Sequence, residues 1–364
     1  MRSQAAQSGR LLAGAGPGCF RPARASALRL GHRRTEGWPG RLAALFDRQG
    51  QYEKALEWYE RALAGREKAL GIDHPHTLTT VNCMGLVFVN QGQYQKALEW
   101  YERALAGREK ALGVDHPHTL TTVHSMALVF GKQGQYAKAL EWYGRALAED
   151  EKALGVDHPH TLNTVHCMAV IFNNQGQYGR ALEWYERALA GYEKALGVDH
   201  PHTLTTVHNI ASIFCRQGQY EKALEWLERV LAGNEKALGI DHPHTLHTVH
   251  SMASLFRDQG QYEKALEWYE RALAGYGKAL GVDHPYTLST VNCMAFVFEK
   301  QEQYEKALEW YERALAGREK ALGIDHPDTQ NTLRCLINLY QSVGQTEQAQ
   351  SLQPCLYAPE SPHN

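Results

Sequence analysis

The sequence lacks several features that mark common classes of protein. No apolar run approaches the roughly 18 residues that a membrane-spanning helix needs. Its 38 basic and 40 acidic residues give a net charge of −2, and the chain has no clustered basic face of the kind that nucleic-acid binding requires. With 43% hydrophobic residues it is not globally disordered either. We therefore expect a folded protein whose partners are neither nucleic acids nor membranes.

Signatures of disulfide frameworks, metal sites and catalysis are equally sparse. Four of the seven cysteines occupy one position of a repeated segment, namely Cys83, Cys167, Cys293 and Cys335. Free thiols of this kind suit a reducing compartment, so we predict a cytoplasmic protein. Histidine pairs such as His116 and His118 flank a proline, and no cysteine or carboxylate completes a tetrahedral metal set. With no nucleophile elbow and no carboxylate pair set apart by its context, we predict no metal, no cofactor and no enzymatic activity.

What the chain does have is a 42-residue segment that begins at Gly50 and recurs almost letter for letter. The first glycine of this segment returns at Gly92, Gly134, Gly176, Gly218 and Gly260, and the spacing continues through Glu302 to Gly344. A fixed period of this size indicates a solenoid, because one repeat is too small to bury its own apolar face and must stack on its neighbours.

Each repeat reads as two helices, which we call A and B. In the third repeat, helix A is predicted from about His118 to Lys132 and helix B from about Tyr136 to Leu154. The predicted core of this repeat comprises Leu120, Val123, Met126, Ala127 and Phe130 from helix A, with Ala139, Leu140, Tyr143, Ala146 and Leu147 from helix B. Gly155 is the expected C-cap.

Two further local features are predicted in this repeat. The next helix begins after Asp157-His158-Pro159, where either Asp157 or His158 is available as its N-cap. On helix B, Glu141 and Arg145 have the spacing of an ion pair one turn apart.

The chain divides into three segments. Residues 1–37 follow no helical or strand period, and residues 1–40 hold seven arginines against one glutamate, so the rest of the chain carries −8. We predict a disordered basic arm there, with mitochondrial targeting as an alternative because transit peptides are also rich in arginine. Residues 38–353 form the repeat array, with an abbreviated first repeat, six full repeats and a polar C-terminal cap. Residues 354–364 are a predicted disordered tail.

The small and aromatic positions identify the repeat. Val123, Met126, Ala127 and Phe130, followed by Ala139, Tyr143 and Ala146, resemble the tetratricopeptide repeat. The longer helix B and the Leu-Gly-x-Asp-His-Pro connection resemble the repeats of kinesin light chains and of arrays in some fungal nucleotide-dependent receptors. The resemblance implies an all-α superhelical solenoid of antiparallel helix pairs that binds a protein partner. The chain lacks the long heptad segment of a kinesin light chain and the GxxxxGK[ST] phosphate loop of a receptor ATPase.

In this family the A helices line a concave groove that holds a partner peptide or helix. The repeats of this chain differ mainly on helix A, where one polar position runs through Asn82, His124, His166, His208, His250, Asn292 and Arg334. We predict that this row faces the groove and bonds to a partner's backbone. The alternative is that its imidazoles bond only to neighbouring helices. If the row is open to solvent, lowering the pH from about 7.5 to about 5.5 should charge it.

A second variable row lies at the C-terminal ends of the A helices. Its predicted groove residues are Lys132, Asn174, Arg216, Arg257 and Lys300. Four of these are cations, which favours an acidic partner segment. The alternative is a solvated face of mixed charge, since Asp258 and Glu299 lie among them. The sequence therefore predicts a non-catalytic scaffold or adaptor, like a kinesin light chain, and as an alternative a detached sensor module of a nucleotide-switch receptor.

Overall fold

The computed structural model describes residues 38–48 and 51–356. The predicted basic arm and most of the predicted tail lie outside these residues. Within them the chain is helical, with one short 3-10 turn and no strand. The A helices are α1 (Trp38–Arg48), α3 (Pro75–Asn90), α5 (Pro117–Lys132), α7 (Pro159–Asn174), α9 (Pro201–Arg216), α11 (Pro243–Asp258), α13 (Pro285–Lys300) and α15 (Pro327–Ser342). The B helices are α2 (Tyr52–Leu70), α4 (Tyr94–Leu112), α6 (Tyr136–Leu154), α8 (Tyr178–Leu196), α10 (Tyr220–Leu238), α12 (Tyr262–Ala279), α14 (Tyr304–Leu322) and α16 (Thr346–Leu352).

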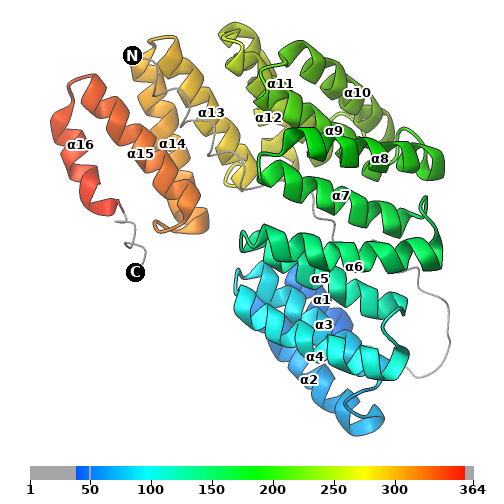
Figure 1. The fold of residues 1–364 in the computed structure, drawn as a ribbon. Coiled ribbons are helices and arrows are strands. Elements are labelled where there is room, and N and C mark those ends of the chain that lie inside the picture. The colour runs from blue at the N-terminus through cyan, green and yellow to red at the C-terminus, as the bar shows by residue number, and fades with distance from the viewer. Residues whose placement is uncertain (1–37, 49–50, 357–364) are drawn as a thin grey trace. The chain divides into compact units, whose positions relative to one another are not determined.

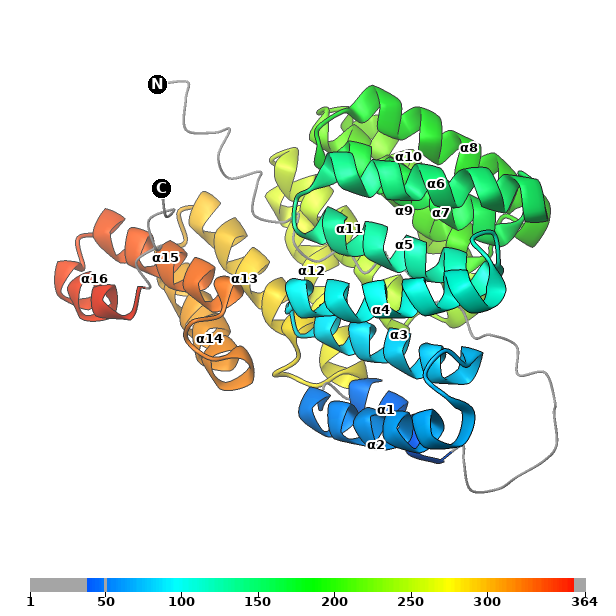
Figure 2. The ribbon, with the colours of Figure 1, turned by 60° about the horizontal axis from the view of Figure 1, so that its bottom comes forward.

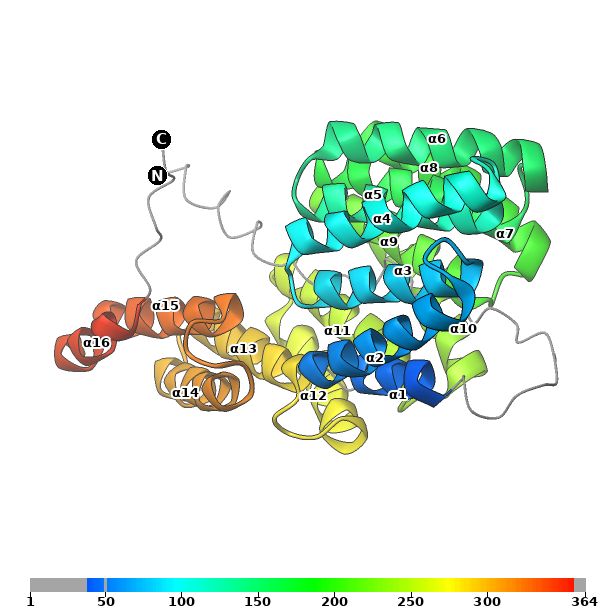
Figure 3. The ribbon, with the colours of Figure 1, turned by 90° about the horizontal axis from the view of Figure 1, so that it is seen from below.

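The chain forms two compact units, which divide between Leu196 and Gly197. Unit 1 contains α1 to α8, and unit 2 contains α9 to α16 (Figure 1). In each unit every A helix packs against the B helix of its own repeat, and that B helix packs against the next A helix. Figures 2 and 3 show this alternation in unit 1, where the helix pairs follow one another in chain order from α1 to α8. Stacked helix pairs are the architecture that the 42-residue period predicts.

The third repeat shows how closely the apolar pattern determines the core. Helices α5 and α6 begin and end within one residue of their predicted bounds. All predicted core residues of α5 are buried, and those of α6 are buried except Leu140, which is half-buried. Small residues such as Ala127 and Ala139 are completely inaccessible, because they allow the A and B helices to approach closely while Tyr143 fills the space beside them.

The connection between repeats is built from the Gly-x-Asp-His-Pro segment. Gly155 ends α6 with φ +93°, a conformation that favours glycine. His158, one of the two predicted caps, is the N-cap of α7, where its Nδ1 accepts a hydrogen bond from the backbone N–H of His160 at 3.2 Å. Asp157 instead pairs with Lys194 of the next B helix at 2.5 Å. The connection therefore joins consecutive repeats as well as consecutive helices.

The predicted ion pair between Glu141 and Arg145 is wrong. The Arg145 guanidinium reaches back 36 residues to Glu109 on the preceding B helix, at 2.5 Å. The same pair joins Arg271 to Glu235 in unit 2. Stacking brings equivalent positions of neighbouring B helices together, and this proximity cannot be read from the period of a single helix. These pairs tie successive B helices to one another.

The C-terminal repeat ends the array of unit 2. Helix α16 has only seven residues and is followed by a 3-10 turn over Gln353–Cys355. Gln330 occupies the position where the six A helices α3 to α13 carry a buried leucine, and its side-chain N–H group donates to the carbonyl oxygens of Ile324 and Cys355, both at 2.9 Å. The chain thus folds back over the last repeat where a full B helix would otherwise pack.

Candidate binding face

The A helices of each unit make a surface of their own. In unit 1, α3 lies against α5 and α5 against α7, and in unit 2, α11 lies against α13. Within either unit no two B helices lie against one another to the same extent. We call this surface the A face and define it separately for each unit. It carries the two predicted rows. The first row runs from Asn82 to His166 in unit 1 and from His208 to Arg334 in unit 2. The second row runs from Lys132 to Asn174 in unit 1 and from Arg216 to Lys300 in unit 2.

The first row forms hydrogen bonds from one A helix to the next. Asn82 accepts a hydrogen bond from the hydroxyl of Thr122 at 3.2 Å, and Asn292 accepts one from Thr332 at 3.0 Å. Of the histidines, His250 reaches the equivalent partner, with its Nδ1 3.1 Å from the hydroxyl of Thr290, whereas His124 Nε2 lies 3.2 Å from the side-chain nitrogen of Asn163, one repeat position earlier. His208 Nε2 lies 3.4 Å from the hydroxyl of Ser251. The row therefore links neighbouring repeats in both units.

Three of the four histidines of this row are also packed against tyrosines, whereas His208 meets the ring of His247. His124 meets the ring of Tyr143 edge-on, with 5.1 Å between ring centroids, and His250 meets Tyr269 in the same way at 5.2 Å. His166, which meets Tyr185, is only 2% exposed. Each tyrosine comes from the B helix of the same repeat, so the small-aromatic pattern that makes the core also covers the imidazoles.

Burial changes the acid-base behaviour of these imidazoles. Desolvation lowers the pKa of His124 and of His250 to about 4, and that of His208 to about 3. The expectation that this row charges between about pH 7.5 and about pH 5.5 is therefore wrong, because these three histidines remain neutral throughout that range. Their neutral rings offer a partner hydrogen bonds but no charge.

The second row differs from the first because most of its members are open to solvent. Lys132, Asn174, Arg216 and Lys300 are exposed, as is Arg334 at the end of the first row. Among the described residues, no carboxylate lies within ion-pair distance of any of these four cations. Lys300 lies 4.9 Å from the centre of the Phe296 ring and makes no ion pair there. Three of these four cations therefore lie at the C-terminal ends of A helices, Arg334 lies midway along α15, and all but Lys132 belong to unit 2.

Arg257 is the exception in this row, because its side chain is only 12% exposed. Its guanidinium donates to the hydroxyl of Tyr269 at 3.4 Å and contacts the Cys293 sulfur at 3.9 Å. Asp258 pairs with the same group at 2.8 Å, so the charge of Arg257 is already matched within the fold. Arg257 contributes to the packing between α11 and α13 more than to the open surface.

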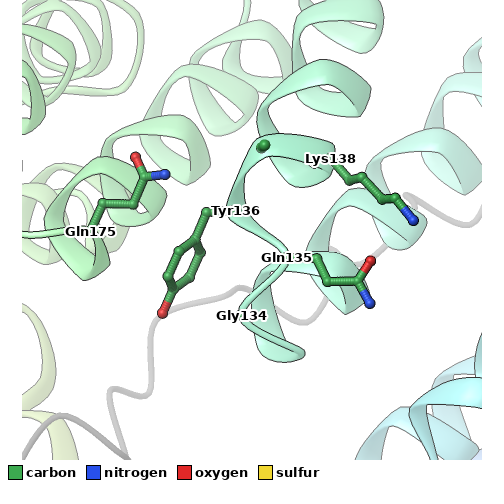
Figure 4. Close-up of a pocket in the computed structure, with 6 residues that line it drawn as sticks. Gly134, Gln135, Tyr136, Lys138 and Gln175 are labelled. Carbon is green, nitrogen blue, oxygen red and sulfur yellow. The ribbon is translucent and has the colours of Figure 1, made fainter.

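Two shallow recesses lie at the turns between A and B helices, next in sequence to the second row. One, of about 370 Å³, is lined by Gly134 to Lys138 and by Gln175 at the end of α7. Figure 4 shows Tyr136 of this recess beside Gln175. The other, of about 380 Å³, lies two repeats earlier, at Gln51 to Lys54 and Gln91. Because both recesses follow the repeat, they result from helix stacking and not from a specialised site.

The described part of the chain contains no group of three metal-ligating side chains placed to hold an ion. Each His-Pro-His pair is instead used for capping, as at His116, whose Nδ1 accepts from the backbone N–H of His118 at 3.1 Å. Across the same residues no helix is long and apolar enough to cross a membrane.

These features define a helical-repeat protein built from stacked A and B hairpins. The tetratricopeptide repeat family matches residues 38–110, 77–152, 122–193, 160–236, 204–278 and 286–353, so the chain belongs to this family. Its repeats are of the kinesin-light-chain type: a putative kinesin light chain from Podosopora anserina with nearly identical repeats is 31% identical, over 56% of this chain and 97% of that one, with a TM-score of 0.49. Tetratricopeptide repeats are typically non-catalytic scaffolds for protein interactions. Among curated proteins, none matches this chain.

Other solved structures share the fold alone. A tetratricopeptide repeat protein from Parabacteroides merdae is 16% identical, with a TM-score of 0.55, over 82% of this chain and 97% of that one. A signal transduction ATPase with numerous domains from Pyrococcus horikoshii, which has a tetratricopeptide repeat sensor, is 14% identical with a TM-score of 0.59. That match covers 88% of this chain and 46% of the ATPase. Repeat arrays in proteins of different function therefore have this arrangement of helices.

Proposed function

We propose that this protein is a non-catalytic adaptor whose A faces bind a segment of a partner protein. The single observation that carries the proposal is the contrast between the cations of the A and B helices. Lys132, Arg216, Lys300 and Arg334 are exposed on A helices without a carboxylate partner. Unmatched cations on a surface that varies between repeats favour an acidic partner segment.

Most cations of the B helices contact a carboxylate or an aromatic ring of the fold. On the A helices Lys300 also contacts a ring, whereas Lys132, Arg216 and Arg334 have neither kind of partner among the described residues. Arg145 pairs with Glu109 and lies 5.8 Å from the centre of the Trp142 ring. Lys138 lies 5.6 Å from the ring of Phe130 on its own A helix. These contacts recur from repeat to repeat, which explains why helix B is nearly invariant. On helix A, by contrast, the exposed variable positions such as Lys132 and Arg216 make no such contact among the described residues and are available for recognition.

The first row has a supporting part in this proposal. Its neutral imidazoles and amides hold successive A helices in register and present hydrogen-bonding groups beside the exposed cations. A partner's backbone would bond to these groups while its acidic side chains meet Arg216, Lys300 and Arg334 in unit 2. A preformed face of this kind binds with little rearrangement of its own.

Two biological settings are compatible with an adaptor of this kind. The sequence likeness to a putative kinesin light chain supports a cargo adaptor, which is our preferred form. A sensor module of a nucleotide-switch receptor is the alternative, and its support is the shared fold alone. We propose a cytoplasmic location, because the six described cysteines are free thiols. A mitochondrial location is the alternative, and it depends on the arginine-rich arm.

Capture of partners from a native extract tests the proposal. The bait is the full chain, compared with a unit 2 A-face variant, Arg216→Glu/Lys300→Glu/Arg334→Glu. The matched control is a B-helix variant with the same change of charge, Lys222→Glu/Lys264→Glu/Lys306→Glu, whose lysines are also exposed in unit 2. We expect mass spectrometry to find partners that the wild type and the control retain and the A-face variant loses. Equal capture by the two variants would contradict the proposal.

A further inference from the structure

One junction between repeats departs from the pattern at two adjacent residues of α6. Glu149 stands where every other full-length B helix has a glycine, and Asp150 stands where three of the others have an arginine. Those arginines are Arg66, Arg108 and Arg318. The change from Gly-Arg to Glu-Asp replaces one positive charge by two negative charges. By comparison with Gly107 and Arg108, the first position faces the A helix of the same repeat and the second faces the next A helix.

The arginine junctions show what this position does in three of the other repeats, while Tyr192, Asn234 and Tyr276 occupy it in the remaining ones. Arg108 is 3% exposed, and its Nη1 donates to the backbone carbonyl of His118 and to the hydroxyl of Thr122, both at 2.6 Å. Arg318 donates to the equivalent carbonyl of Asp328 at 2.9 Å and to the hydroxyl of Thr332 at 2.5 Å. A buried guanidinium therefore closes the junction in these repeats.

At the α6–α7 junction a carboxylate is buried in the place of that guanidinium. Asp150 is completely buried, and its Oδ2 lies 2.9 Å from Nδ1 of His160 and accepts from the hydroxyl of Thr164 at 3.3 Å. Its Oδ1 accepts no hydrogen bond, and no lysine or arginine of the described chain pairs with it. A buried carboxylate without a fixed cation is less stable than a paired one.

Glu149 adds a steric cost and a second poorly satisfied carboxylate. At the equivalent Gly107, an added Cβ would lie 2.6 Å from the Leu78 side chain. Glu149 Oε2 is buried without a hydrogen bond, and its nearest cation is Lys152 Nζ at 3.6 Å. Gly-Arg at these two positions would pack and pair better than Glu-Asp, so the two acidic residues point to a role other than stabilising the fold.

A second acceptor lies at the α6–α7 junction, on α7. Asn163, one turn into α7, has an Oδ1 without a hydrogen bond, while its Nδ2 lies 3.2 Å from His124 Nε2. The ring centroids of His124 and His160 are 6.4 Å apart, so this cluster is continuous with the first row of the A face in unit 1. Burial lowers the pKa of His124 to about 4, so this ring supplies no charge to Asp150 at neutral pH.

We propose that this cluster binds the guanidinium group of an arginine side chain from a partner protein. A planar group with five N–H donors and a fixed positive charge suits the acceptors on Asp150 and Asn163. His160, whose side chain is 35% exposed, covers Asp150 and turns aside to admit the ligand. The bound guanidinium then takes the place that Arg108 fills in the preceding repeat.

This inference rests on the proposed function only for the source of the arginine. If the A face binds acidic segments through unit 2, an arginine of the same partner would bind to unit 1. The binding of a free guanidinium probe is a property of the junction itself. It can therefore be tested without a partner, and its failure would leave the charge contrast of the A face unaffected.

The experiment compares Nα-acetyl-arginine amide with the uncharged Nα-acetyl-citrulline amide, using the full chain and a Glu149→Gly/Asp150→Arg variant. This variant restores the sequence of the preceding repeat, so we expect it to fold with a higher Tm than the wild type. For a Kd of about 10 mM, about 50 mM arginine probe should raise the Tm of the wild type by about 2 °C or more. The citrulline probe should not raise it, and neither probe should affect the variant.

An Asp150→Asn variant, close in shape to the wild type, gives a second measurement. We expect it to fold and to lose at least half of the arginine-specific Tm shift. Nuclear magnetic resonance of the His124 and His160 ring protons should show shifts with the arginine probe in the wild type only. The proposal is overturned if both probes act alike, if the Gly-Arg variant responds as the wild type does, or if Zn²⁺ or Mg²⁺ alone reproduces the arginine response.

Discussion

Two glycines in identical sequence surroundings allow the packing between A and B helices to be measured directly. Gly65 and Gly107 both lie in the segment RALAGREKALG, on α2 and α4. A Cβ at Gly107 would lie 2.6 and 2.9 Å from the two methyl groups of Leu78, which is 1% exposed. At Gly65 nothing in the described chain lies within 4 Å, because the equivalent of Leu78 precedes Trp38. The two positions therefore share helix propensity and differ in packing.

We expect Gly65→Ala to stabilise the protein by about 1 kcal/mol, the usual difference between glycine and alanine inside a helix. Gly107→Ala should gain the same amount and lose about 1–3 kcal/mol through overpacking against Leu78. The two variants should thus differ by about 1–3 kcal/mol in urea unfolding followed by circular dichroism, with hydrogen exchange of α4 as the local measurement. Adding Leu78→Val to Gly107→Ala should recover part of the loss. Equal effects of the two alanines would refute the close approach of α3 and α4.

Three further predictions concern pH, ion pairing and a strained turn. Burial lowers the pKa of His124 and His250 below that of the unfolded chain, so the free energy of unfolding should be greatest above about pH 6.5. Between about pH 6.5 and about pH 4, each of these histidines should lower it by up to about 1.4 kcal/mol for each pH unit. His124→Asn/His250→Asn should flatten this slope in thermal melts at several pH values, and an unchanged slope would contradict the burial of the rings. In a double-mutant cycle, Glu109→Ala and Arg145→Ala should show a coupling of about 0.5 kcal/mol, whereas full additivity would show that the pair contributes nothing. Glu302 has φ +59° at a position where the other full repeats have glycine. Glu302→Gly should therefore stabilise the protein by about 1 kcal/mol, as measured by urea unfolding. A loss of stability would show that the glutamate backbone is not strained.

The local structure could be predicted from the sequence because the same apolar, capping and turn residues recur in each repeat. The bounds of α5 and α6 follow from the apolar period together with Gly155 and Pro117. Contacts between repeats could not be predicted in the same way. The partner of Arg145 lies 36 residues away, and the choice between Asp157 and His158 as cap depends on Lys194 of the next B helix.

The candidate site could be predicted in part. Variation between repeats located the A helices as the variable surface, and the polar row does lie along them. The burial of His124 and Arg257 could not be foreseen, because it depends on tyrosines of the adjacent B helices. The cluster around Asp150 was missed, although the replacement of Gly-Arg by Glu-Asp is visible in the sequence. Departure from a repeat is informative only once the structure shows that the position is buried.

The central claim, that the A face binds acidic segments through its unmatched cations, is tested most directly by fluorescence anisotropy with a panel of labelled peptides. Each peptide with several Asp and Glu residues is paired with one that carries Asn and Gln at the same positions. For the acidic peptides that bind, we predict that Arg216→Glu/Lys300→Glu/Arg334→Glu weakens affinity about tenfold or more, while Lys222→Glu/Lys264→Glu/Lys306→Glu changes it less than about threefold. If the two variants weaken binding equally, or if amide peptides bind as well as acidic ones, the A face is not the site of charge recognition and the account fails.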